Sequence, residues 1–111
     1  QVLKSYDDIF WGLDSRSMLV MTMFELGQWI DLQEHELKNF VKFMQRNPNI
    51  SSKRRKSYLA FVHALRLFLR ILLAPIHLRQ KNLLALKQKL LLADRPISPW
   101  IMQKIDAYLK P

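Results

Sequence analysis

The chain contains no cysteine and only two glycines among its 111 residues, together with five prolines. The absence of cysteine excludes disulfide bonds and thiolate metal sites, and it leaves the redox compartment undetermined. An all-β chain of this length needs many more turn residues. Half of the residues are hydrophobic, and residue types that favour helices are common. The composition therefore predicts an all-α protein, long enough for one domain with a hydrophobic core.

Acidic residues are scarce in the second half of the chain. Residues 1–50 hold five Lys/Arg and seven Asp/Glu, which gives a net charge of −2. Residues 51–111 hold thirteen Lys/Arg and two Asp, which gives +11. Such asymmetry between the two halves is typical of a protein with an acidic partner.

The sequence also lacks an uninterrupted apolar run long enough to cross a membrane. The longest run, residues 58–74, is broken by His63, Arg66 and Arg70. Charged side chains near the middle of a lone membrane span are costly, so we expect a buried helix here and no transmembrane segment. We expect a cytoplasmic protein. Because the chain begins at Gln1, a targeting segment upstream would not be visible in it.

Hydrophobic periodicity and boundary residues predict six helices, packed in antiparallel hairpins with short loops. Gly12 is expected to end the first helix and Gly27 the second. Ser51 or Ser52 is expected to cap the fourth helix, and Ser98 the sixth. The helices are predicted at about residues 2–12, 15–26, 30–45, 51–73, 76–92 and 99 to the end.

Two of these helices have apolar patterns that predict their buried faces. The segment 15–26 is apolar or small on most of its sides, and a helix of this kind is expected to be buried on most sides. In the segment 30–45 the residues at helical spacing are Ile30, Leu37, Val41 and Met44. We expect these four side chains to form one stripe on the buried face, which Phe40 and Phe43 widen.

No pattern of catalytic or metal-binding residues is present. His35 and Glu36 begin a sequence like the zinc motif H-E-x-x-H, but Asn39 stands where the second histidine is needed. Two isolated glycines cannot build a phosphate-binding loop, and no serine has a recognisable base nearby in sequence. We therefore expect a protein that is not an enzyme and that has no metal and no cofactor.

The densest charge feature is the run of four cations from Lys53 to Lys56, at the start of the predicted fourth helix. Cations at a helix N-terminus oppose the helix dipole. Lys/Arg clusters supply the salt-dependent part of nucleic-acid affinity, although a solvated helix end explains the run equally well. The candidate basic surface consists of Lys53, Arg54, Arg55, Lys56, Arg66, Arg70, Arg79 and Lys81.

The segment Leu26-Gly27-Gln28-Trp29 joins two amphipathic helices in a hairpin. It resembles the middle of a tetratricopeptide repeat, in which a glycine sits at the elbow and an aromatic residue follows two positions later. The resemblance implies that Gly27 and Trp29 form a structural repeat elbow. It also implies that the hairpin stacks on neighbouring repeats to bury its apolar face.

A broader similarity covers most of the chain. The segments DDIF (7–10), LDSRS (13–17), FELG (24–27) and WIM (100–102) resemble the C-terminal ends of uncharacterised tetratricopeptide-type proteins from Bacteroidota. This bacterial resemblance implies degenerate repeat helices in residues 1–49. Residues 50–111 would hold a long central helix and C-terminal capping helices, packed with the first part as one domain. It implies upstream repeats and no catalytic residues.

These observations predict a protein-protein interaction module that acts as a scaffold, the C-terminal part of a larger helical-repeat protein. The partner expected first is a protein or peptide, and the module is also expected to pack on upstream repeats. The alternative is a basic helical module that binds nucleic acid. A third interpretation is attachment to a membrane surface through the basic, leucine-rich helix at 76–92. The sequence leaves the oligomeric state open.

Overall fold

The computed structural model describes residues 6–93 and 97–109, with side chains from residue 12 onward. Helices account for nearly all of these residues, and no strand occurs among them, which confirms the all-α fold. The chain divides into two compact units, residues 1–55 and 56–111. Residues 2–5, the first four of the predicted first helix, lie outside the described residues.

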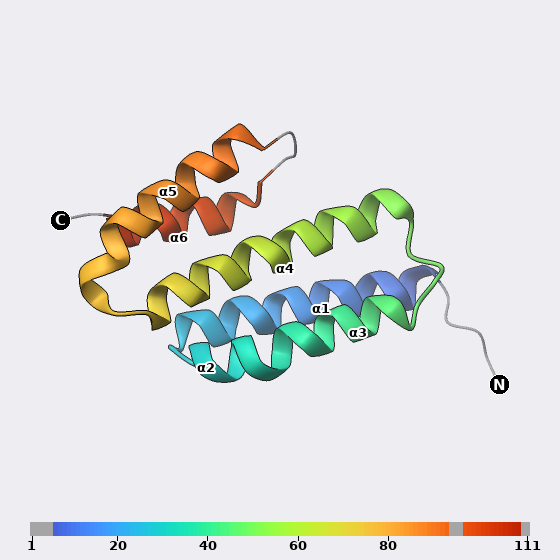
Figure 1. Cartoon of the computed structure of the whole chain (residues 1–111). Helices are drawn as coiled ribbons and strands as arrows, with labels where there is room; N and C mark the ends of the chain where they lie inside the picture. The colour runs from blue at the N-terminus through green and yellow to red at the C-terminus, as the bar shows by residue number, and fades with distance from the viewer. Residues whose placement is uncertain (1–5, 94–96, 110–111) are drawn as a thin grey trace. The chain divides into compact units, whose positions relative to one another are not determined.

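Unit 1 is a helical hairpin followed by the first turn of the next helix. It begins with α1 (Tyr6–Glu25) and returns along a second helical rod (Figure 1). This rod consists of α2 (Trp29–Asp31), a π-helical turn η1 (Leu32–Glu36) and α3 (Leu37–Gln45). The two predicted helices on either side of Gly12 are therefore one helix, and the described residues form five helical rods instead of six.

Gly12 does not end a helix. It lacks a side chain, and this leaves room for an aromatic ring. A Cβ atom at this position would clash with Cζ of Phe43 and would lie 3.1 Å from its Cε1. The guanidinium of Arg16, one turn further along α1, lies 4.6 Å from the centroid of the same ring. Phe43 thus packs directly on the α1 backbone at a place where any side chain would hold the two helices apart.

Gly27 ends α1, as the sequence predicts, with a φ of 75° in the left-handed region. The Gln28 amide donates to the carbonyl of Met23 at 3.0 Å, and the Gly27 amide donates to the carbonyl of Phe24 at 3.1 Å. These two bonds form a Schellman motif, which satisfies carbonyls that the helix leaves open. Trp29 closes the elbow, since its Nε1 donates to the Phe24 carbonyl at 3.0 Å.

The second rod buries Leu32, Leu37, Phe40 and Met44. Leu32 and Leu37 are five residues apart, and the wider π-helical turn between them keeps both on the buried side. Ile30, which ordinary α-helical spacing places in line with Leu37, is instead 66% exposed. The prediction of a buried stripe that includes Ile30 is therefore wrong, because the π-helical turn changes the register between them.

The C-terminal part of α1 is buried on one side only. Val20, Met23 and Phe24 lie in the core, whereas Met18 and Leu26 are each 67% exposed. The expectation that this segment is buried on most sides is wrong, because α1 has an apolar solvent-facing side as well as an apolar core-facing side.

Unit 2 contains α4 (Ser52–Leu73) from Lys56 onward, a 3₁₀ turn η2 (Ile76–Leu78), α5 (Arg79–Leu92) and α6 (Pro99–Leu109). Figure 1 shows α5 and α6 as an antiparallel pair. The core of the unit comes from all three helices. Its buried side chains are Val62, Ala64, Leu65, Phe68, Leu69, Leu72, Leu83, Leu86, Leu90, Ile101 and Ile105.

The boundaries of α4 and α6 follow the capping residues in the sequence. Ser51 is the residue that caps α4, since its Oγ accepts a hydrogen bond from the Arg54 amide at 3.2 Å. Ser98 caps α6 in the same way, accepting from the Ile101 amide at 3.4 Å, and Pro99 occupies the first helical position. Among the described residues, no helix is both long enough and apolar enough to span a membrane.

Replacing Gly27 with valine is expected to lower the free energy of unfolding by about 1–2 kcal/mol, the cost of a left-handed conformation for a residue with a side chain. No atom lies within 4 Å of the added Cβ, so backbone strain alone causes the loss. Thermal or urea unfolding measures it. Gly27→Asn is the control and should lose less, because asparagine tolerates this conformation better. An unchanged melting temperature for Gly27→Val would contradict this role for the glycine.

Candidate functional site

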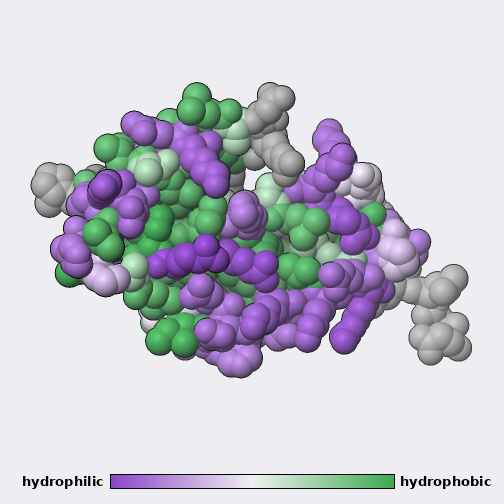
Figure 2. Space-filling view, viewed as in Figure 1, coloured by the Kyte–Doolittle hydropathy of each residue, from purple (hydrophilic) through white to green (hydrophobic). Residues whose placement is uncertain are grey.

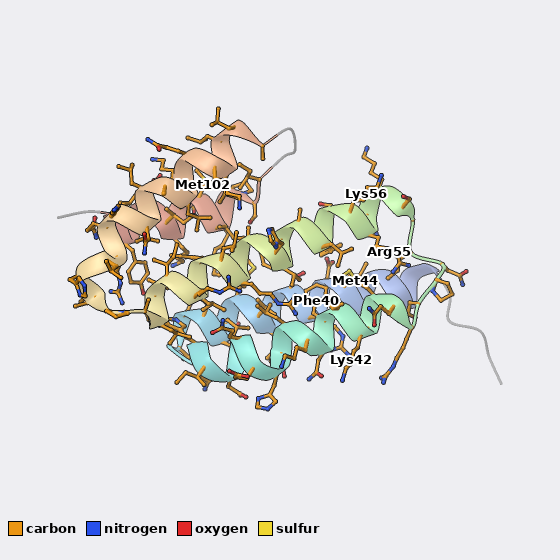
Figure 3. The ribbon with its side chains drawn as sticks, viewed as in Figure 1. Phe40, Lys42, Met44, Arg55, Lys56 and Met102 are labelled. Carbon is orange, nitrogen blue, oxygen red and sulfur yellow. The ribbon has the colours of Figure 1, made fainter. Side chains whose placement is uncertain are left out.

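Arg55 belongs to the run of cations at the start of α4, but its side chain is used inside unit 1. Its Nη1 donates to the carbonyl of Met44 at 2.6 Å, and its Nη2 donates to the carbonyl of Asn47 at 3.0 Å. Figure 3 shows Arg55 directed toward the end of α3, near Met44. Both acceptors lie at or just beyond the C-terminus of α3, where helix carbonyls lack partners and the helix dipole favours a cation.

Arg79 has the same role in unit 2. Its Nη2 donates to the carbonyl of Leu72, in the last turn of α4, at 3.0 Å. Its guanidinium also lies 5.7 Å from the centroid of the Tyr108 ring, which contributes a cation–π contact. Two of the eight residues of the candidate basic surface thus have structural partners at helix ends.

The other members of the cationic run are placed differently. Lys53 is exposed and Arg54 is half-buried at the start of α4. Lys56 is exposed, and Figure 3 shows its side chain pointing away from the helix. The run of four cations is therefore not one uniform patch, because its members point in different directions around the helix.

Along α4 three cations and one histidine form a stripe that remains available to solvent. Lys56, His63 and Arg70 recur every seven residues and Arg66 lies between the last two, which places all four on one side of the helix. Lys56, His63 and Arg70 are exposed and Arg66 is half-buried. The 22 residues of α4 include no Asp or Glu. We call this set the α4 cationic stripe.

Lys81, the last residue of the candidate basic surface, lies on the solvent side of α5. This helix also carries exposed leucines. Leu84, Leu91 and Leu92 are exposed on this helix, together with Lys81 and Lys89. Lys81 lies one turn before Leu84, and Lys89 lies one turn before Leu92. We call these five residues the α5 face, which combines exposed leucines with lysines and lacks carboxylates.

A third surface lies on α1 and the elbow of unit 1. Met18, Leu19, Leu26 and Ile30 are all exposed there. We call these four residues the α1 face. All four side chains were predicted to be buried. For Met18 and Leu19, the signal that could have identified them as exposed is the apolar character of α1 on opposite sides of the helix.

The residues that could perform chemistry are dispersed. His35 Nδ1 lies 2.8 Å from Asp31 Oδ1, one turn earlier on the same rod, and both side chains are exposed. The residues with described placement contain no group of three His, Cys, Asp or Glu side chains that could hold a metal ion. Of the tryptophans, Trp29 packs against Phe24, Trp100 lies 6.3 Å from Phe61 between ring centroids, and the Trp11 side chain lies outside the described residues.

Comparison with protein-family models, with curated proteins and with solved structures gave no match to this chain.

Replacing Arg55 with methionine is expected to lower the free energy of unfolding by about 1.5–3 kcal/mol, because two carbonyls lose a charged hydrogen-bond donor. Urea unfolding followed by circular dichroism measures the change. The matched control is Lys53→Met, which removes an exposed cation two residues earlier and should alter stability by about 0.5 kcal/mol or less. Equal effects of the two substitutions would contradict the structural role of Arg55.

Proposed function

We propose that this protein is a non-enzymatic protein-protein interaction module, a scaffold that binds a helical segment of a partner protein through the α1 face. The observation that carries the proposal is the exposure of four large apolar side chains, Met18, Leu19, Leu26 and Ile30, on one hairpin. Single exposed apolar residues are ordinary, but a contiguous set marks an interaction surface.

The spacing of the α1 face favours a helical partner. Met18, Thr22 and Leu26 recur every four residues, which forms the type of ridge that packs into the groove of another helix. Leu19 widens this ridge, and Ile30 extends the apolar surface beyond the elbow. An amphipathic helix with its own apolar stripe is the complementary surface.

The resemblance of the elbow to a tetratricopeptide repeat supports the same class of partner. Helical repeats bury their apolar faces by stacking on neighbouring helices. Under this proposal the partner helix belongs either to a preceding repeat of a longer chain or to a separate protein. In both cases the α1 face loses its exposure to water when the partner binds.

The α1 face is tested with the double variant Met18→Gln/Leu26→Gln. Proteins retained by the wild-type chain are identified, purified and titrated against both forms by calorimetry. We expect the variant to bind at least about tenfold more weakly, since fully burying one such side chain contributes about 1.5–3 kcal/mol. Circular dichroism should show unchanged folding.

The matched control for this experiment is Leu84→Gln/Leu91→Gln, which removes exposed apolar residues from unit 2 and should leave the affinity unchanged. A partner that binds the wild type and the α1 variant equally, or that is lost only with the control variant, would overturn the assignment to the α1 face.

A second candidate function, nucleic-acid binding, is favoured by the α4 cationic stripe. The stripe lies on a helix without acidic residues, in a unit whose ten Lys/Arg and two Asp give a net charge of +8. Cations at regular spacing along a helix can contact successive phosphates, and this contribution to affinity depends on salt. The exposed large hydrophobic side chains of α4 are Leu59 and Leu73, which cannot stack on bases as aromatic residues do.

Fluorescence anisotropy with labelled duplex DNA and single-stranded RNA tests the second candidate. Binding through the stripe should weaken steeply with salt, and Arg66→Gln/Arg70→Gln should reduce the salt slope for duplex DNA by about 2. Lys38→Gln/Lys42→Gln, which removes two exposed cations from α3, is the matched control. Arg55 is left in place, because its loss would disturb the fold. Absence of binding at low salt would exclude this function.

A further inference from the structure

We propose that unit 2 binds the surface of an anionic phospholipid membrane through the α5 face. The proposal concerns a surface and a ligand class separate from those of the α1 face. It rests on the combination of exposed leucines and lysines on one helix, and on the charge of the unit that carries them.

The leucines of the α5 face are turned to solvent along most of the helix. Leu84 and Leu91 are seven residues apart and lie on one line, and Leu92, about 100° further around the helix, is also exposed. Leu91 is 61% exposed and Leu92 is 87% exposed. Figure 2 shows apolar surface gathered over the C-terminal part of α5. Just before the helix, Ile76 in η2 is also exposed.

The charged residues of η2 and α5 are all basic. Lys81 and Lys89 are exposed on α5, and neither η2 nor α5 contains an acidic residue. Within the described part of α6 the one acid is Asp106, which pairs with Lys87 at 2.7 Å. Among the residues with described placement, no carboxylate pairs with Lys81 or Lys89, so the α5 face presents cations beside apolar side chains. This combination matches the boundary between lipid headgroups and acyl chains.

This combination separates an anionic lipid surface from the other possible occupants. A second copy of the unit would bring two net charges of +8 together, which electrostatic repulsion opposes. A nucleic acid offers phosphates for Lys81 and Lys89 but no apolar phase for Leu91 and Leu92.

The geometry fits a helix that lies in the plane of the membrane surface. The 14 residues of α5 extend roughly 21 Å at 1.5 Å per residue, which is shorter than the hydrocarbon core of a bilayer. The leucines would enter the boundary beneath the headgroups. The flexible side chains of Lys81 and Lys89 would extend back toward the lipid phosphates, as lysines do at membrane interfaces.

Co-sedimentation of the full chain with vesicles tests the proposal. Phosphatidylcholine vesicles that contain phosphatidylglycerol should retain the wild type, and pure phosphatidylcholine vesicles should retain little. Leu84→Gln/Leu91→Gln should reduce binding about tenfold or more, because the apolar contribution is lost. Lys81→Gln/Lys89→Gln should reduce it by a similar factor, because each cation adds to the attraction. Binding should also weaken with salt.

Two control variants test whether vesicle binding depends on the α5 face and not on charge or apolar surface elsewhere. Lys38→Gln/Lys42→Gln removes the same charge from unit 1, and Met18→Gln/Leu26→Gln removes apolar residues from the α1 face, so both should bind vesicles like the wild type. The second control also separates the two proposals, because it should weaken partner binding at least about tenfold while leaving vesicle binding intact. Circular dichroism of each variant confirms folding.

Three results would overturn the inference. The first is no retention on anionic vesicles at low salt. The second is equal retention on neutral and anionic vesicles. The third is retention that depends on Lys81 and Lys89 but not on Leu84 and Leu91, since this would show attraction of a cationic unit to any polyanion.

Discussion

The structure depends on satisfying the carbonyl groups that every helix leaves open at its C-terminus. The ends of α1, α3, α4 and α6 use a glycine, a guanidinium or a side-chain amide for this. The end of α1 is closed by Gly27, α3 by the guanidinium of Arg55, α4 by the guanidinium of Arg79, and α6 by Gln80, whose Nε2 donates to the Tyr108 carbonyl at 2.7 Å. For α1, α3 and α4 the closing group comes from the segment that follows the helix. The bond that completes one helix therefore also fixes where the chain goes next.

Much of this fold follows from local sequence. Helix-forming composition predicts the all-α class, and boundary residues such as Gly27 and Ser98 act within a few positions of themselves. Gly12 could not be interpreted in this way, because its role depends on Phe43 in the opposite rod of the hairpin. In the sequence, a glycine that ends a helix cannot be distinguished from a glycine that makes room for a neighbouring ring. Only the packing of the two helices distinguishes them.

The residue composition of the candidate surfaces could be predicted from the sequence, but the directions of their side chains could not. The sequence shows that residues 51–111 are strongly basic, and it identifies Arg55 and Lys56 as neighbours in one cationic run. It does not show that Arg55 turns to helix carbonyls while Lys56 turns to solvent. The exposed residues of α1 were missed for a related reason: apolar character indicates burial on average, and the surfaces proposed for binding are the exceptions.

The π-helical turn at Leu32–Glu36 has a consequence for chain length. Downstream of it, Leu37, Phe40 and Met44 follow ordinary α-helical spacing, whereas Leu32 precedes Leu37 by five positions instead of four. Loss of one residue between Leu32 and Leu37 would bring the two leucines to the regular interval and leave an uninterrupted α-helix. This rod can therefore accommodate a deletion at one internal site without exposing its core side chains, a tolerance usually associated with loops.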